Sequence, residues 1–220
     1  MFLESGCLKV RGDRVALERL IEIVQACRRC ATMEGRRRVL SHANGQPGAR
    51  VLFVAEAPGR FGGERTGIPL SADQTGRNFR RLLDAAGLDG DEVFITNAVL
   101  CNPRRDGKNR APAAWEVANC REHLVRTIDA VDPPLVAALG VVALRSLAAI
   151  APHEATLRTV GKPVAWYGRS LVPLYHPGPR AQIHRSFAQQ QEDFRLLGAL
   201  VRELTHRRPR SLQPAECAPC

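Results

Sequence analysis

Four cysteines are the residues whose type and spacing most directly suggest chemistry in this sequence. Cys27 and Cys30 are separated by two residues, and Cys101 and Cys120 lie on either side of an arginine-rich stretch. Four thiolates are what a zinc ion or an iron-sulfur cluster requires. The second pair lacks the close spacing of a zinc ribbon, so spacing alone leaves the kind of metal open.

A carboxylate and an imidazole form the second set. Glu56 lies in Ala-Glu-Ala-Pro-Gly at 55–59, and His176 begins His-Pro-Gly-Pro at 176–179. A carboxylate can orient or deprotonate a water, and a histidine can donate a hydrogen bond to charge developing on a leaving group. The pair therefore indicates hydrolysis. The alternative is structural, with Glu56 capping a loop and His176 serving as a turn residue before proline.

These residues need strands and helices to position them. Short runs rich in β-branched residues predict strands at 51–54, 93–99, 135–139 and 170–175. Helical spacing of apolar residues predicts a helix that begins after Asp13 and ends near Cys27, and further helices at 79–86, 113–130, 141–150 and 182–205.

This alternation predicts an α/β fold, a three-layer α/β/α sandwich with a central, mostly parallel four-stranded sheet. Ligands of such sheets bind beyond the carboxyl ends of the strands. Glu56, Asn97 and His176 each lie at the end of a predicted strand or directly after one. We therefore expect these three side chains to meet in one crevice.

The length of 220 residues and the hydrophobic content of 45% suit one domain with a proper core. We expect that domain at 1–205 and a basic tail at 206–220, with Cys217 and Cys220 not binding metal. No apolar run is long enough to cross a bilayer, and the first residues do not resemble a signal peptide. A cytoplasmic monomer is therefore expected.

The charge balance favours a polyanionic partner. Lys and Arg number 32 against 22 Asp and Glu, a net charge of +10, and nearly all of the positive charge is arginine. Arginine suits phosphate contacts, and a basic surface attracts nucleic acid of any sequence. The alternative is an arginine-rich proteome that raises the charge of every protein.

The motif at 55–59, Thr-Asn-Ala-Val-Leu-Cys at 96–101, Tyr-His-Pro at 175–177 and the four-cysteine pattern together resemble the iron-sulfur members of the uracil-DNA glycosylase superfamily. The likeness spans about Leu17 to Phe194. Glu56 matches the acidic position of family 4. The stretch at 65–76 resembles family 5, which lacks that acidic residue and accepts more deaminated bases. The sequence is therefore a hybrid of the two families.

The resemblance implies a structural [4Fe-4S] cluster held by Cys27, Cys30, Cys101 and Cys120. It makes Glu56 the carboxylate that positions water, Asn97 the reader of the polar edge of uracil, and His176 the stabiliser of the departing uracil anion. The alternative for Asn97 is a residue that only caps the end of its strand. It implies a monofunctional glycosylase that removes uracil from single-stranded or double-stranded DNA and leaves an abasic site.

Base binding is expected at Asn97, Leu70 and Gly59. Leu70 stands where both families have a phenylalanine that stacks on the extruded base, and Ala55 replaces the usual first glycine. Either departure implies weaker stacking or an altered base preference.

Two basic groups are expected to contact DNA phosphates, in the loop after Cys101 and at the start of the last helix, where a helix N-terminus would assist. Their members are Arg104, Arg105, Lys108 and Arg110, and Arg180, His184 and Arg185. The alternative for each is ordinary solvated charge.

Two other functions fit the sequence. One is an iron-sulfur DNA-binding protein of the same fold with little or no glycosylase activity. The other is a zinc-stabilised α/β hydrolase that acts on a small substrate.

Overall fold

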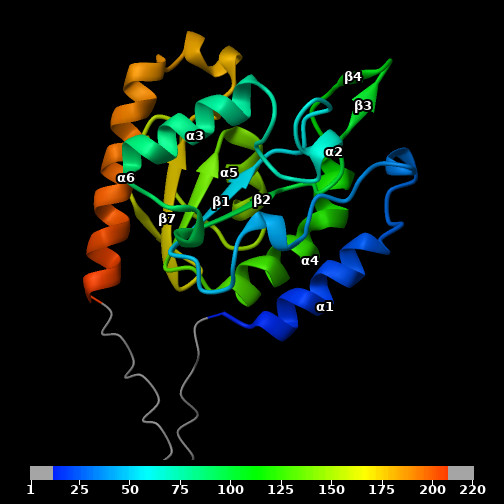
Figure 1. The fold of residues 1–220 in the computed structure, drawn as a ribbon, viewed down its shortest axis with the longest axis horizontal. Helices are drawn as coiled ribbons and strands as arrows, with labels where there is room; N and C mark the ends of the chain where they lie inside the picture. The colour runs from blue at the N-terminus through cyan, green and yellow to red at the C-terminus, as the bar shows by residue number, and fades with distance from the viewer. Residues whose placement is uncertain (1–11, 208–220) are drawn as a thin grey trace, which may run out of the picture.

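A five-stranded sheet forms the centre of the computed structural model, which describes residues 12–207 (Figure 1). Its strands are β1 (Val51–Ala55), β2 (Val93–Asn97), β5 (Leu135–Leu139), β6 (Val164–Trp166) and β7 (Arg169–Leu174). Their order is β2-β1-β5-β7-β6, and only β6 at the edge pairs in the antiparallel sense. The predicted fold class, α/β with a mostly parallel sheet, is confirmed. The sheet has one strand more than the four that were expected.

Helices cover both faces of the sheet. They are α1 (Arg14–Gln25), α2 (Gly63–Thr66), α3 (Gln74–Ala86), α4 (Ala114–Val131), α5 (Val141–Ala148) and α6 (Phe187–Arg207). Short 3-10 turns are η1 (Ala31–Met33), η2 (His42–Asn44), η3 (Gly90–Glu92) and η4 (Pro179–Ile183). A separate hairpin, β3 (Arg104–Arg105) and β4 (Lys108–Asn109), projects from the molecule near α2 (Figure 1).

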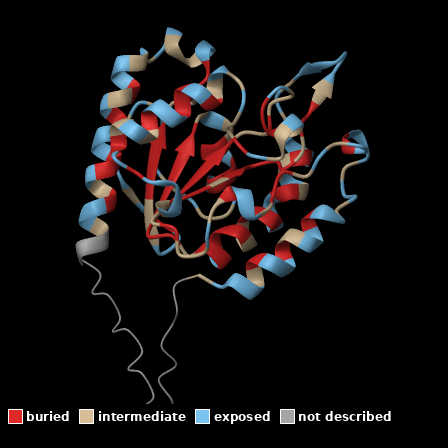
Figure 2. Ribbon diagram, in the orientation of Figure 1, coloured by how far each residue is buried: buried red, intermediate tan, exposed pale blue. Residues whose placement is uncertain are grey.

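The side-chain alternation of β1 explains the three layers. Val51, Phe53 and Ala55 pack into the core under α3 and α6, whereas Leu52 and Val54 pack into the core under α1, α4 and α5. All five residues are buried (Figure 2). A strand whose two sides both face helices must be apolar at every position, as the sequence of β1 is.

Helix termini lie where the capping residues indicated. Asp13 caps α1 by accepting a hydrogen bond of 2.9 Å from the backbone N–H of Ala16. Gly87 ends α3 in the left-handed conformation with φ 64°. The first helix ends at Gln25, so it delivers Cys27 directly after its last turn, as predicted.

The fifth strand was missed because its turn has unusual residues. β6 joins β7 through Tyr167 and Gly168, both with positive φ (47° and 71°), and Trp166 pairs with Arg169. Two-residue hairpins with two positive φ values normally carry Asn-Gly or Asp-Gly, so Tyr-Gly did not indicate a turn.

The last helix begins at Phe187, five residues later than the predicted start at 182. Ser186 and Gln189 form a reciprocal cap, in which each side chain accepts a hydrogen bond from the backbone N–H of the other. Arg180, His184 and Arg185 therefore lie in η4 and the connection after it, not in the helix that was expected to assist them.

The helix α6 continues to Arg207, two residues past the predicted end of the domain at 205. The rest of the predicted tail, with Cys217 and Cys220, lies outside the described residues. Among residues 12–207, no helix has the length and apolar character needed to cross a membrane.

Gly198 sets the contact between α6 and α3, and this yields a prediction. A Cβ atom at this position would overlap the backbone carbonyl of Ala86. Helix propensity alone would make Gly198→Ala stabilising by about 1 kcal/mol. We expect instead a loss of about 1–3 kcal/mol in the free energy of unfolding, measured with urea, because backbone cannot yield to the methyl group. Gly90→Ala, where no atom lies within 4 Å of the added Cβ, is the matched control; equal effects of the two changes would contradict this packing.

Candidate active site

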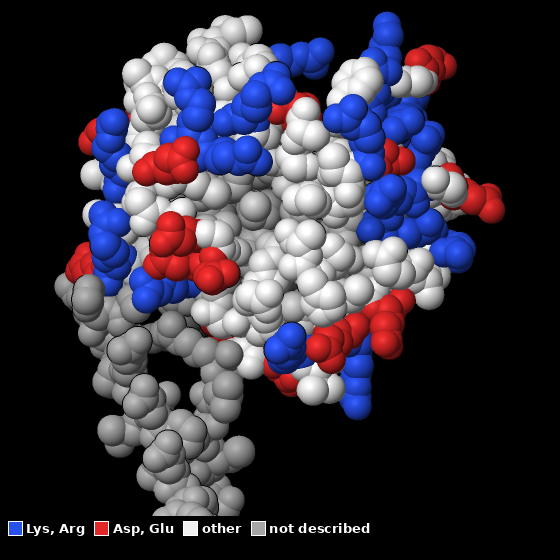
Figure 3. All heavy atoms as spheres, in the orientation of Figure 1, with Lys and Arg blue, Asp and Glu red and all other residues white. Residues whose placement is uncertain are grey.

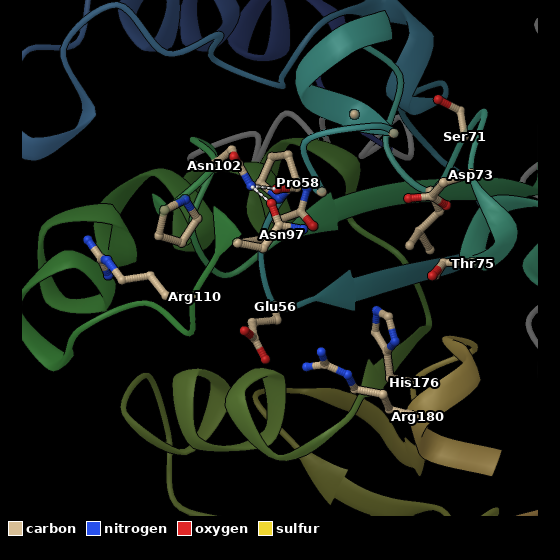
Figure 4. Close-up of a pocket in the computed structure, with 17 residues that line it drawn as sticks. Glu56, Pro58, Ser71, Asp73, Thr75, Asn97, Asn102, Arg110, His176 and Arg180 are labelled. Carbon is tan, nitrogen blue, oxygen red and sulfur yellow. Dashed lines mark hydrogen bonds between the residues drawn. The ribbon is translucent and has the colours of Figure 1, made fainter. Parts of the chain in front are cut away.

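Glu56, Asn97 and His176 lie on one cavity at the carboxyl edge of the sheet. The parallel register of β1 and β2 places Ala55 opposite Asn97, so Glu56 follows β1 beside the end of β2. His176 follows the end of β7, two strands from β1. The cavity has a volume of about 320 Å³, and the three side chains come to it from three strand ends (Figure 4).

The imidazole of His176 is held in one tautomer when it is neutral. Its Nδ1 accepts a hydrogen bond of 3.1 Å from the backbone N–H of Gly178. A neutral ring whose Nδ1 accepts must carry its proton on Nε2. Burial lowers the pKa of His176 below 6.5, although the nearby charge of Asp73 opposes this. The site therefore offers a neutral ring with a donor at Nε2 near neutral pH.

Glu56 lies half-buried at the cavity wall. Burial raises the pKa of its carboxyl above the ordinary 4.5. A carboxylate with a raised pKa is a stronger base than one in water, and it can take a proton or orient a water. Glu56 therefore has the properties of a general base.

Asn97 presents an unsatisfied amide to the cavity. The residue is 2% exposed, and its Nδ2 has no hydrogen-bond partner among the described residues. Leaving a buried donor unpaired costs about 1–3 kcal/mol. Since Asn97 lines the cavity, a ligand with a polar edge would supply the missing acceptor.

Leu70 and Gly59, the other predicted base-binding residues, also line the cavity. Leu70 has a left-handed backbone with φ 47°, and so does Ala72 with φ 61°. The turn between them brings Ser71 and Asp73 to the wall. Asp73 also caps α3, because its Oδ1 accepts a hydrogen bond of 2.9 Å from Gly76 N.

Several polar wall residues were not among the predicted site residues. Asp73, Thr75, Asn102 and Asn109 line the cavity beside the predicted set. Asp73 carried a usable signal, since an aspartate directly before a helical pattern is a typical N-cap. The two asparagines carried none, because their positions depend on a hairpin that was expected to be an irregular loop.

That hairpin is joined to the loop after β1 by a chain of hydrogen bonds, most of which involve the side-chain amides of Asn102 and Asn109. Asn102 Nδ2 donates both to the carbonyl of Pro58 and, at 3.0 Å, to Asn109 Oδ1. Asn109 Oδ1 also accepts from the backbone N–H of Arg60 at 3.1 Å, and Arg60 Nη1 donates to Gly107 O at 2.6 Å. The wall of the cavity is therefore one connected unit.

Three of the seven basic residues that are expected to contact phosphates form ion pairs with carboxylates of the protein itself. Arg104, Arg110 and Arg185 pair with Glu64, Glu116 and Asp193. These three arginines hold loops of the scaffold, and Arg110 also lines the cavity, so their contact with DNA stays a prediction.

The other four basic residues are exposed: Arg105, Lys108, Arg180 and His184. Arg105 and Lys108 face each other at the tip of the hairpin. Basic side chains gather on the right of the space-filling view, the side on which Figure 1 places the hairpin (Figure 3). Arg180 lines the cavity and points into it (Figure 4).

The four predicted cysteine ligands line a second, much smaller cavity. Cys27, Cys30, Cys101 and Cys120 come from the exit of α1, the end of β2 and the second turn of α4. Burial raises the pKa of Cys101 to about 12 and that of Cys120 to about 11. Thiols of this kind stay protonated near neutral pH unless a metal displaces the proton.

The four thiols are the donor set of either a zinc ion or an iron-sulfur cluster. Asn119 Nδ2 lies 3.4 Å from Cys30 Sγ, and hydrogen bonds to sulfur occur at iron-sulfur sites. Within residues 12–207, no group of three or more His, Cys, Asp or Glu side chains is arranged to hold one metal ion.

A buried carboxylate joins the cysteine segment to the hairpin. Glu116 is fully buried, and its Oε1 accepts hydrogen bonds from Thr32 at 2.9 Å and from Arg110 Nη2 at 2.5 Å. Its Oε2 accepts from Arg110 Nη1 and from the backbone of Ala113, each at 2.7 Å. Thr32 lies two residues after Cys30, so one side chain connects η1, α4 and the end of the hairpin.

Comparisons with known proteins agree on one family. The family model "Uracil DNA glycosylase superfamily" matches residues 42–198. A Type-4 uracil-DNA glycosylase from Thermotoga maritima is 30% identical over 162 residues, which cover 73% of this chain and 81% of the relative. One from Archaeoglobus fulgidus is 28% identical, covering 84% of this chain and 93% of the relative. A Type-5 uracil-DNA glycosylase from Pyrobaculum aerophilum is 36% identical, covering 61% and 64%.

The contacts of Glu116 give a pH-dependent prediction. Glu116→Gln removes the charge partner of Arg110 and is expected to lower the free energy of unfolding at pH 7 by about 3 kcal/mol. The bond from Arg110 lowers the pKa of Glu116 below 4.5, so the extra stability is complete above 4.5 and is lost as pH falls through the lower, folded-state pKa. The difference between the two proteins in urea unfolding should therefore shrink in acid. A difference that stays constant or grows on acidification would refute the ion pair's role.

Proposed function

The chain belongs to the uracil DNA glycosylase superfamily, and we propose that it hydrolyses the N-glycosidic bond of uracil in DNA and leaves an abasic site. It is therefore a hydrolase of base excision repair. A uracil inside a duplex cannot reach a cavity of this depth, so the nucleotide must be rotated out of the stack. The observation that carries the proposal is that Glu56, Asn97 and His176 line one cavity while the buried Asn97 amide lacks a protein partner.

Glu56 acts on the sugar side of the bond. Cleavage builds positive charge on the deoxyribose and negative charge on uracil. The carboxylate stabilises that positive charge and orients a water for attack, accepting its proton as the new carbon–oxygen bond forms. Its raised pKa makes the proton transfer more favourable than it would be for an exposed glutamate.

His176 and Asn97 act on the base side. The neutral His176 donates a hydrogen bond from Nε2 to the uracil oxygen on which negative charge develops, and this favours departure of the anion. Asn97 reads the polar edge of uracil, with Nδ2 donating to a carbonyl oxygen and Oδ1 accepting from the ring N–H. Leu70 and Gly59 supply the apolar and close-fitting parts of the base site.

The exposed basic side chains bind the phosphates of the DNA. Arg105, Lys108 and His184 hold the DNA backbone, while Arg180 reaches the phosphates nearest the extruded nucleotide. Arg105 and Lys108 repel each other across the hairpin, and a phosphate between them would relieve that repulsion.

The four cysteines hold a [4Fe-4S] cluster under this proposal. Cys27, Cys30, Cys101 and Cys120 are its ligands, and the bound cluster crosslinks three chain segments without taking part in bond cleavage. The positive charge of the irons keeps the buried thiols deprotonated. We also propose that the protein is a cytoplasmic monomer.

Single-turnover uracil release tests the roles of Glu56 and His176. Glu56→Gln and His176→Ala should each lower the rate about 100-fold or more while DNA binding persists. Glu56 acts as the carboxylate and His176 as the neutral imidazole, so the wild-type rate should decrease as the pH is lowered through the acidic range. The decrease should begin when one of the two groups becomes protonated and become steeper once both are. Glu56→Gln should lose one of the two ionisations. Leu196→Ala, at an exposed position of α6 that lines neither the active-site cavity nor the cysteine cavity, is a control for general damage.

A panel of single-stranded and double-stranded oligonucleotides containing uracil, hypoxanthine or xanthine gives the base range. Salt-dependent binding of these strands with no base release would contradict the glycosylase and favour a binding protein.

Metal analysis tests the cluster. Protein purified without oxygen should be brown and contain iron and acid-labile sulfide, and Cys101→Ser should lose both because a buried hydroxyl does not replace a thiolate ligand. Cys217→Ser should keep the wild-type content. A colourless wild-type protein with one zinc per chain would refute the cluster.

A further inference from the structure

Phe61 is an exposed aromatic residue on the loop that follows β1. It is 59% exposed, although an aromatic ring gains most from burial. Its chain neighbours at 59 and 62 are glycines that line the cavity. Phe61 therefore lies on the loop that also carries Glu56, between residues that line the cavity.

The ring is held in place from one side. The guanidinium of Arg60 lies over it, with Cζ 4.1 Å from the ring centroid. That guanidinium is itself fixed, because Arg60 Nη1 donates to Gly107 O and the Arg60 backbone N–H donates to Asn109 Oδ1. One face of Phe61 is covered by a cation anchored to the hairpin, and the high exposure leaves the other face open to solvent.

The positive charge near this ring indicates what kind of molecule could bind to its open face. The hairpin that anchors Arg60 carries Arg105 and Lys108 on its exposed tip. A molecule that covers the open ring face beside these cations should combine a flat π surface with a negatively charged backbone. Single-stranded nucleic acid has both features, because bases stack on aromatic side chains while cations follow the phosphates.

We propose that the open face of Phe61 is a stacking subsite for a base next to the extruded uracil in single-stranded DNA. The proposal rests on the proposed function and names the form of substrate that the same site prefers. In a duplex the neighbouring base is held in the helix by pairing and by the stack on its far side, whereas in a single strand it is free to turn onto the ring. Stacking on Phe61 therefore favours uracil in single strands over uracil in duplexes.

The test is the affinity for labelled single-stranded DNA, measured by fluorescence anisotropy over a range of salt concentrations. All variants are made in the full-length Glu56→Gln protein, so the strand stays intact. Phe61→Ala should weaken binding by about 5-fold or more, the low end of stacking on one aromatic side chain. Phe61→Trp should retain binding. Ile68→Ala removes another exposed apolar side chain, 44% exposed, from the same loop region and should have no effect.

Salt dependence separates stacking from charge. Phe61→Ala should leave the slope of log Kd against log salt unchanged, whereas Arg105→Ala should reduce it by about 0.7, the value for one phosphate contact in a single strand. Replacing the base on one side of uracil by an abasic spacer should weaken binding as Phe61→Ala does, and should have no further effect in that variant.

The outcomes are distinct. Equal affinities of Phe61→Ala and its parent, or spacers that have no effect on either side of uracil, overturn the subsite even when the wild-type enzyme releases uracil. The opposite pattern, in which Phe61→Ala and the spacers act as expected but the wild-type chain releases no base, overturns the glycosylase and leaves the stacking subsite standing.

Discussion

The parallel pairing of β1 with β2 and β5 is the constraint on which the site depends. Parallel strands bring their carboxyl ends to the same edge, and the register that sets Ala55 opposite Asn97 leaves Glu56 no other place than beside it. β7 reaches the same edge through its pairing with β5, where the backbone N–H of Gly140 donates to the carbonyl of Leu174. Residues far apart in the chain therefore meet through backbone hydrogen bonds alone. The helices add burial, which shifts the pKa of the carboxyl upward and that of the imidazole downward.

Charge in this molecule has two separate uses. The carboxylates of Glu64, Glu116 and Asp193 neutralise arginines close to the site, and these pairs fix the hairpin and the segment before α6. The cations left over, such as Arg105 and Lys108, are exposed at the hairpin tip. A basic net charge therefore overstates the surface available to a polyanion, because part of it is consumed in holding the loops that present the remainder.

Much of the architecture could be predicted from the sequence, because the strong signals are local. The buried run of β1, the Asp13 cap and the Gly87 stop each lie within a few residues of what they determine. The edge strand β6 was not predicted because the turn that follows it needs Tyr167 in a left-handed backbone conformation, which tyrosine rarely adopts. Asn102 and Asn109 joined the cavity wall through hydrogen bonds that exist only once the hairpin has folded onto the loop at 58–60. Local patterns indicate elements and their ends, whereas these contacts depend on tertiary structure.

The chain order of the four cysteines has a consequence for synthesis. All four are present once residue 120 has left the ribosome, together with β1, β2 and the hairpin that follows β2. β5, β7 and the imidazole that closes the pocket come later. Domains fold as the chain emerges from its N-terminal end. The four thiols are therefore synthesised before the second half of the active site.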